Sequence, residues 1–484
     1  MSVFSSSIKS TIIDPVFHSD TRCEFRLANR GESYLPTMRI GNLGLSTSGD
    51  DNTYHFGPGA IAVISRIQLL DGNEPLDTLR NVGNWLTFKN SLHSNSQNDN
   101  VFNKMVGGST GWATGATGEL LSNNNKIIRA SGGAETLGTL DLREVFPLLN
   151  SISHLSTKLF KNLRVVIEYN TSKIALVNGT GGTDTYTKSI PILIVDEIID
   201  EALAATYDKQ LVSAAWTAIE HDQVGVPAVP GMPAAPAVGD VALSVQQAVN
   251  LRVNGFQNKA VGRVVISKVY QDLDNYLYGA DALAGVKALA QYGSKALHKE
   301  EFNMRINGRN VLTGRGLVTP ESMAALCGDS WGDLNVCPGT FTESVGMDCK
   351  YDLTDATLLP ATLIGRPPRN WVGVNRTYPR ILTAGGNLDA AGTAWEAGEE
   401  PTAQQGVWVG NSSWIGLGVH DRVTDMQLQM TRTGNPTSVR TPAVIATDQP
   451  TSSAGNEKAM DVHVFAEVSK VLQVGGGSYK ISYV

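Results

Sequence analysis

Short runs of alternating apolar and polar residues, separated by pairs of turn-forming residues, recur along this 484-residue chain. Residues 302–307 alternate Phe, Met and Ile with Asn and Arg. Residues 461–469 alternate polar residues with Val and Ala, except that Phe465 interrupts the polar side. An alternation of period two is typical of antiparallel strands that bury one face. Pairs that accept the positive φ of a tight turn lie between such runs: Asp71-Gly72, Asn178-Gly179, Asn254-Gly255 and Asn307-Gly308. The chain is therefore predicted to be all-β with short helices.

The short helices are predicted between some of these strands. Asp77 and Asp141 are candidate N-caps for two of them, and the spacing of Leu203, Tyr207 and Leu211 predicts a third. None is long enough to connect neighbouring parallel strands, so an alternating α/β sheet is not expected.

Chain length and two changes in composition predict two domains. At roughly 100–200 residues per domain, the chain is long enough for two or more hydrophobic cores. The clearest boundary lies near Asp200, where a dense apolar strand ends and a new series of alternating runs begins. We therefore expect an N-terminal arm over residues 1–16, a first β-sandwich over 17–200 and a second over 201–484, with a Pro/Ala-rich loop at 227–240.

The composition excludes several classes of protein. With 42% apolar and 18% charged residues, the chain has enough apolar side chains to form cores, unlike a disordered protein. Its net charge is −7 and it has no block of basic residues, so direct binding to nucleic acid is not expected. No stretch approaches the ~18–20 apolar residues of a membrane-spanning helix. The first residues lack the pattern of a secretory signal peptide, and the four cysteines are expected to be reduced.

The sequence shows no catalytic, cofactor-binding or metal-binding site. Residues 107–111 fit the G-x-S-x-G pattern of a nucleophile elbow, but the strand and helix that such an elbow needs are missing around them. Cys327, Cys337 and Cys349 lack the close pairs of a zinc site, and the eight histidines do not occur at the spacing of metal ligands. We therefore expect no enzymatic activity, no cofactor and no bound metal.

Several segments combine strand, turn and helix patterns in an order that matches a known family. They are residues 63–72 with the following helix around Trp85, residues 141–146, 163–169 and 301–309, and the C-terminal runs 462–468 and 478–483. Together they resemble the double jelly-roll major capsid proteins, of the lineage that includes adenoviruses, virophages and polinton-like viruses. The resemblance is one of pattern and spacing over most of the chain.

This resemblance implies a fold and a function. Two tandem jelly-roll sandwiches with long loop insertions would form a pseudo-hexagonal homotrimer, which contacts neighbouring capsomers, penton and minor capsid proteins in an icosahedral shell. The polar segments 90–138 and 383–457, the second with isolated strands, would be long outward loops. The serine-rich arm 1–16 would lie at the base and become ordered only on assembly, and a contact with an inner membrane stays open. The protein would then be a virion component, made in the host cytosol or a virus factory and not secreted.

Two other classes of protein compete with this hypothesis. A carbohydrate-binding or adhesive β-sandwich protein, such as a receptor-binding subunit, would show clustered aromatic residues on one loop face or a set of calcium ligands. An enzyme on a jelly-roll or cupin-like scaffold would need paired histidines and a carboxylate at metal spacing. Neither pattern is apparent in the sequence, so we expect a capsid protein, with the adhesive protein as the alternative.

Overall fold

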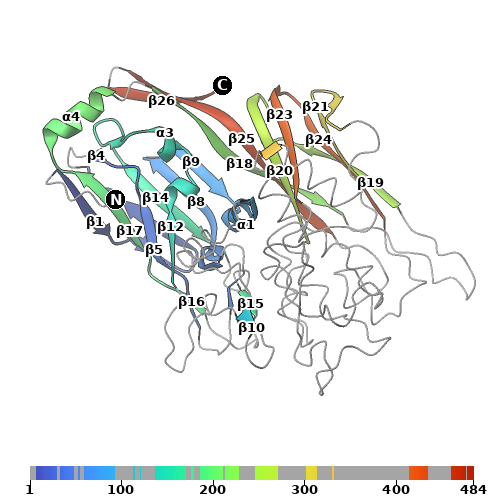
Figure 1. Ribbon diagram of the computed structural model, residues 1–484, viewed down its shortest axis with the longest axis horizontal. Helices are drawn as coiled ribbons and strands as arrows, with labels where there is room; N and C mark the ends of the chain where they lie inside the picture. The colour runs from blue at the N-terminus through green and yellow to red at the C-terminus, as the bar shows by residue number, and fades with distance from the viewer. Residues whose placement is uncertain are drawn as a thin grey trace, which may run out of the picture.

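Four large antiparallel sheets, packed as two sandwiches, form the computed structural model of the chain (Figure 1). The residues that the structure describes are 7–29, 33–47, 53–54, 59–92, 113–114, 120–121, 137–170, 176–178, 186–210, 213–227, 246–270, 301–312, 330–331, 414–433, 459–475 and 477–484. Within these ranges, no helix is long and apolar enough to cross a membrane.

The N-terminal sandwich packs a six-stranded sheet, sheet I, against a five-stranded sheet, sheet II. Sheet I has the order β12-β5-β17-β4-β13, with β1 added beside β17; its strands are β1 (Ile8–Ile13), β4 (Ser33–Tyr34), β5 (Arg39–Leu43), β12 (Gly138–Asp141), β13 (Leu155–Ser156) and β17 (Ile192–Ile198). Sheet II has the order β2-β3-β14-β8-β9; its strands are β2 (Phe17–His18), β3 (Arg22–Arg26), β8 (Ile64–Asp71), β9 (Glu74–Arg80) and β14 (Leu163–Tyr169). Ile40 and Leu193 of sheet I and Phe25 and Val165 of sheet II are buried in one apolar core.

The C-terminal sandwich is built in the same way from sheets III and IV. Sheet III has the order β18-β25-β20-β23, with β26 added beside β25; its strands are β18 (Ser213–Val226), β20 (Lys259–Tyr270), β23 (Ile415–Val423), β25 (Met460–Gly475) and β26 (Ser478–Tyr483). Sheet IV has the order β19-β24-β21-β22; its strands are β19 (Gln246–Val253), β21 (Glu301–Ile306), β22 (Arg309–Asn310) and β24 (Met426–Thr433). Val264 and Val464 of sheet III pack with Met304 and Leu428 of sheet IV in a second core.

Two long strands, β18 and β25, belong to both cores. Val462 and Val464 of β25 lie in the C-terminal core, whereas Leu472 of the same strand and Trp216 of β18 lie in the N-terminal core. Figure 1 shows β25, in red, extending from one sandwich to the other, with sheet IV on the side far from the N-terminal sandwich. The two sandwiches are therefore joined by continuous strands as well as by side-chain contacts.

Helices and short ladders connect the sheets. Helices bounded within the described residues are α1 (Val82–Leu92), α3 (Leu148–Ser151) and α4 (Glu201–Gln210), together with the 3-10 turns η1 (Gly59–Val63) and η2 (Leu142–Glu144). The two-stranded ladders pair β6 (Leu45–Thr47) with β16 (Tyr186–Lys188), β7 (Thr53–Tyr54) with β15 (Leu176–Asn178), and β10 (Ala113–Thr114) with β11 (Leu120–Leu121). The predicted all-β fold with short helices is confirmed.

The predicted alternation is confirmed in β21 and β25. Phe302 and Met304 of β21, and Val462 and Val464 of β25, are buried in the C-terminal core. Phe465, which interrupts the polar side of β25, is fully buried as well. The reason is that this second face of β25 meets the N-terminal sandwich, so both faces of the strand are covered there.

One predicted helix start was wrong. Asp77 lies within the strand β9, because the turn at Gly72 (φ +60°) pairs β9 with β8, and the helix α1 begins only at Val82. The buried Asp77 carboxylate instead accepts a hydrogen bond from the backbone N–H of Leu148 at the start of α3, at 3.2 Å. The other two predicted helices are confirmed: Asp141 accepts the N–H of Arg143 and caps η2, and α4 contains Leu203 and Tyr207 of the third predicted helix.

The N-terminal arm also differs from the prediction. Ile8–Ile13 form β1 in the single chain and pair antiparallel with β17. Ser10 Oγ donates a hydrogen bond of 2.5 Å to Asp196 of β17, and the β-branched residues Ile8, Thr11, Ile12 and Ile13 supply the strand propensity. This part of the arm is ordered without a second copy, whereas residues 1–6 lie outside the described residues.

Most of the predicted long loops lie outside the described residues, and two strands lie within the last of them. Apart from Pro227, the Pro/Ala-rich loop at 227–240 lies outside the described residues, as does most of 90–138. Within the predicted loop 383–457, the strands β23 and β24 are part of the C-terminal core, because Leu428 and Met430 alternate with polar residues and bury one face.

The side chain of Asn307 links two turns of the C-terminal sandwich by hydrogen bonds. Its Oδ1 accepts the N–H and the hydroxyl of Thr424, at 2.7 and 2.8 Å, and its Nδ2 donates to the carbonyl of Arg422 at 2.8 Å. Its φ is 50°, and that of Gly308 is 80°, as a two-residue hairpin turn requires.

We expect the substitution Asn307→Ala to lower the free energy of unfolding by about 2–3 kcal/mol, because it removes these bonds and puts a Cβ-bearing residue at positive φ. Asn258→Ala is the control, since Asn258 has a φ of 62° and its side chain makes no hydrogen bond within the described part of the chain. Urea titration of both variants separates the two effects. An equal loss for the two would show that the side-chain bonds of Asn307 contribute nothing.

Candidate assembly surfaces

An aromatic cluster, called here the aromatic seam, fills the contact between the two sandwiches. Trp85 and Phe88 come from α1, Phe465 from β25, and Trp331 and Trp414 from the C-terminal half. Ring centroids lie 5.7 Å apart for Trp85 and Phe465, and 5.1 Å apart for Phe88 and Trp414. Aromatic pairs at these separations add to the free energy gained by burying their area. The seam holds the two sandwiches in a fixed relation.

Polar groups secure Trp331 in the seam. Its indole Nε1 donates to the backbone carbonyl of Val264 at 3.2 Å, and the guanidinium of Arg263 lies 4.3 Å from its ring centroid. Arg263 in turn donates to both carboxylate oxygens of Glu467, at 2.6 and 2.5 Å. A bidentate arginine of this kind has a fixed orientation, so it also fixes the tryptophan against sheet III.

A charged cluster lies where β18, β25 and β26 meet. Glu220 accepts from Lys259 at 2.6 Å, from Lys470 at 2.9 Å and from the hydroxyl of Tyr483 at 2.8 Å. Burial by itself would raise the pKa of Glu220, but the two lysines outweigh it and hold that pKa below its usual value. Asp77 is more deeply buried, and burial raises its pKa to about 6 although Lys470 opposes the shift.

Two histidines that are 242 residues apart in the chain meet on sheet III. His221 Nε2 lies 3.0 Å from His463 Nδ1, and the His221 ring also packs on Phe465 with centroids 4.9 Å apart. Burial, then His463 and Arg80, lower the pKa of His221 to about 3. Burial also lowers the pKa of His463 to about 4, against the attraction of Asp461. Sequence spacing could not reveal this pair, because strand register alone brings the two residues together.

An exposed apolar rim lies along one edge of the N-terminal sandwich. It consists of four large side chains that are 51–63% exposed: Ile12, Val16, Phe17 and Ile190. β1 and β2 are edge strands of sheets I and II, and the backbone N–H of Val16, just before β2, donates to the carbonyl of Glu24 in β3 at 2.8 Å. Apolar side chains gathered on an open sheet edge mark a surface that another protein chain can cover.

The described part of the structure contains no catalytic or metal site at the serine, cysteine and histidine residues considered above. Residues 107–111, Cys327, Cys337 and Cys349 lie outside the described residues. Cys23 is a free, buried thiol whose pKa burial raises to about 12, so it is not a reactive nucleophile. Among the described residues, no three His, Cys, Asp or Glu side chains are grouped as metal ligands, and the histidine pair has no third ligand.

Two sandwiches with eleven and nine described strands, side by side in one chain and linked by shared strands, define a double jelly roll. No family model matches the chain, and no curated protein matches its sequence. Among solved structures, the mavirus major capsid protein is similar with a TM-score of 0.51 at 8% identity, over 100% of this chain and 91% of that chain.

Two further structures give scores just below this value. A chain of the Sputnik virophage has a TM-score of 0.49 at 9% identity, covering 99% of this chain and 88% of that one. A chain of the PBCV-1 capsid has a TM-score of 0.49 at 11% identity, covering 99% and 97%. The similarity to the mavirus protein covers the whole chain, so the fold is the double jelly roll that the sequence resemblance predicted.

Proposed function

We propose that this protein is a major capsid protein, a structural component that associates into pseudo-hexagonal homotrimers and tiles an icosahedral virus shell. The observation that carries the proposal is the double jelly roll itself, which extends over the whole chain as in the mavirus major capsid protein. The two seam-joined sandwiches give each copy two similar units, so three copies form a block with six.

The exposed rim supports self-association. Burying Ile12, Val16, Phe17 and Ile190 against a neighbouring copy would remove apolar surface from water, which stabilises an assembly. Partners in this proposal are further trimers, penton and minor capsid proteins, and the protein is located in the virion. We propose no enzymatic role for the protein. We also propose that the boundary between the two sandwiches lies near Asp200.

Light scattering at two dilutions tests the proposal. We expect a dilution-resistant species of three times the 51.7 kDa mass of the chain. Ile12→Asp is expected to shift it toward the single-chain mass, because it places a charge on the rim that a neighbouring copy would bury. Ile199→Asp is the matched control, since Ile199 is also exposed but lies beyond the other end of β17.

The outcomes separate the two hypotheses. A single-chain mass at both dilutions would contradict the trimer. If such a monomer also bound glycans, the adhesive β-sandwich protein would become the better explanation.

A further inference from the structure

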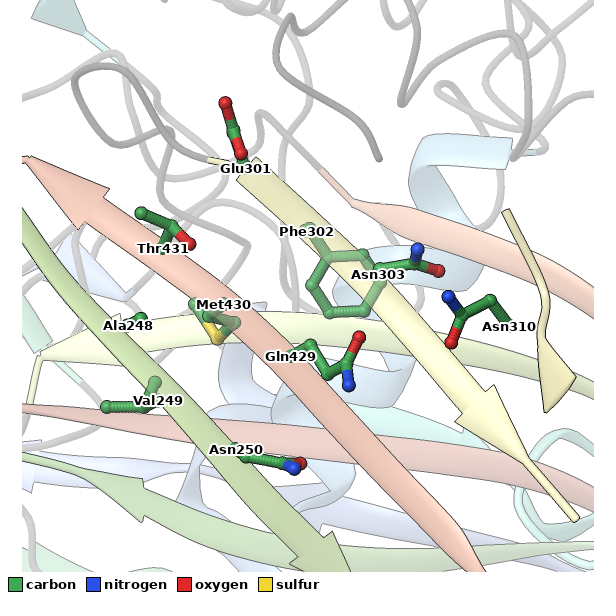
Figure 2. A pocket seen from close by; sticks show the side chains of 10 residues that line it. All are labelled: Ala248, Val249, Asn250, Glu301, Phe302, Asn303, Asn310, Gln429, Met430 and Thr431. Carbon is green, nitrogen blue, oxygen red and sulfur yellow. The ribbon is translucent and has the colours of Figure 1, made fainter. Parts of the chain in front are cut away.

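A pocket of about 360 Å³ lies on sheet IV (Figure 2). Its walls come from all four strands of the sheet, β19, β24, β21 and β22. The side chains of Phe302 and Met430 belong to the buried core face, so the polar side chains of alternate residues form the surface that a ligand would meet.

Strand register arranges these polar side chains in rows. Asn250, Gln429 and Asn303 are opposite one another on three neighbouring strands. The next row contains Thr431 and Glu301, again in register, and Ala248, whose small side chain leaves room above the sheet. Figure 2 shows Gln429, Asn303 and Asn310 close together at one end of the pocket.

Asn303 is held in place before any ligand arrives. It is 8% exposed, and its Oδ1 accepts the N–H groups of Met304 and Leu312 at 2.8 and 3.3 Å. Its Nδ2 donates to the carbonyl of Leu312 at 3.2 Å, which leaves one N–H for the pocket. A donor that is already oriented loses little conformational freedom on binding.

The neighbouring side chains keep unused hydrogen-bonding capacity. Gln429, Thr431 and Glu301 make no side-chain hydrogen bond or ion pair within the described part of the chain. Asn250 donates to Gln427 at 3.3 Å but retains its own carbonyl oxygen. The pocket thus offers amide donors, amide acceptors, a hydroxyl and a carboxylate within one small volume.

We propose that this pocket binds a neutral, hydroxyl-rich carbohydrate of one or two sugar rings. A hydroxyl group both donates and accepts, so it matches paired amide groups, and the volume is at the lower end for small-molecule sites. Among the described residues that line the pocket, only Glu301 has an ionisable side chain, and its carboxylate opposes phosphate, sulfate and acidic sugars.

A protein partner fits this pocket less well. The floor is a sheet face whose backbone groups are already paired between strands, so no strand can be added there. Among the described lining residues, the exposed side offers no large apolar or aromatic anchor. Because no aromatic side chain among these residues is available to stack on a sugar ring, we expect the carbohydrate to bind weakly, with a Kd in the millimolar range. The proposal does not depend on the capsid assignment.

Ligand-observed NMR tests the proposal with the full chain. Saturation transfer is measured to glucose, galactose, mannose and N-acetylglucosamine, and to their common disaccharides. We expect transfer to at least one of them, reduced at least five-fold in Gln429→Leu and in Thr431→Val, which keep side-chain size but remove polar groups. Gln473→Leu, on the exposed part of β25, is the control and is expected to keep full transfer.

Four outcomes would overturn it. One is the absence of transfer to every sugar in a chain whose circular dichroism is that of a folded β protein. Another is equal transfer in Gln429→Leu and Gln473→Leu. The third is competition by inorganic phosphate, which would assign the pocket to anions. A signal that disappears at concentrations where light scattering shows oligomers would likewise overturn it, since the face would then be a contact between copies.

Discussion

Replacing Phe465 with alanine is expected to lower the free energy of unfolding by about 3–5 kcal/mol. Its ring is fully buried and lies 5.7 Å from Trp85 and 4.9 Å from His221, measured between centroids. Alanine would leave a cavity at the point where both sandwiches meet, and the surrounding large rings cannot collapse to fill it. Urea titration followed by tryptophan fluorescence measures the loss.

A double-mutant cycle with Trp85→Ala shows whether the seam acts across the two sandwiches. The double variant is expected to lose about 0.5–1.5 kcal/mol less than the sum of the two single losses, as for aromatic pairs in contact. Phe17→Ala, on the exposed rim, is the control and should change stability by less than about 0.5 kcal/mol in the monomer. Strictly additive losses would contradict a direct coupling.

The same titrations test whether the two cores unfold together. β25 contributes Val464 to one core and Leu472 to the other, so unfolding one sandwich would break a strand that the other needs. We therefore expect one cooperative transition. Two separate transitions, with Phe465→Ala affecting only one, would show that the sandwiches are independent.

Phe465 also shows how far the sequence could predict this fold. Its place on the polar side of an alternating run indicates that both faces of the strand are covered, and they are. The sequence does not show that Trp85, from the other half of the chain, covers it, because no local pattern carries that information. Periodicity predicts strands and their buried faces; which faces meet depends on tertiary packing.

Asp77 shows why a local signal can fail. An Asp before spaced leucines is a valid helix start, but the Asp71-Gly72 turn places the same residues opposite β8, and strand pairing prevails over propensity.

The pocket on sheet IV could be predicted from the sequence only in part. The outward position of Asn303 follows from alternation, whereas its alignment with Gln429 and Asn250 depends on pairing between strands distant in the chain.

Acidification from pH 6.5 to 4.5 is expected to destabilise the protein through His221 and His463. Their pKa values are about 3 and about 4 in the folded chain, below the ordinary 6.5, so the unfolded chain binds protons first as the pH falls. Stability is therefore full above pH 6.5 and is lost as the pH decreases, by at most about 1.4 kcal/mol per pH unit for each ring. Partial exposure of the rings to solvent reduces this, so we expect a total loss of about 2–3 kcal/mol over the window.

Asp77 has the opposite effect, which provides a sharp control. Its folded pKa of about 6 exceeds the ordinary 3.8, so the folded chain binds that proton first and gains stability between pH 6 and pH 4. His221→Phe should therefore flatten the decline of the urea midpoint between pH 6.5 and 4.5, while Asp77→Asn should steepen it. Burial also lowers the pKa of His154, but His154 is present in all three proteins, so its effect cancels in the comparison.

Parallel curves for the wild type and both variants would mean that neither His221 nor Asp77 titrates in this window. Any loss of stability on acidification would then have to come from carboxylates such as Glu220. Because the pKa of Glu220 in the folded chain is lowered, protonating it destabilises the protein only at lower pH.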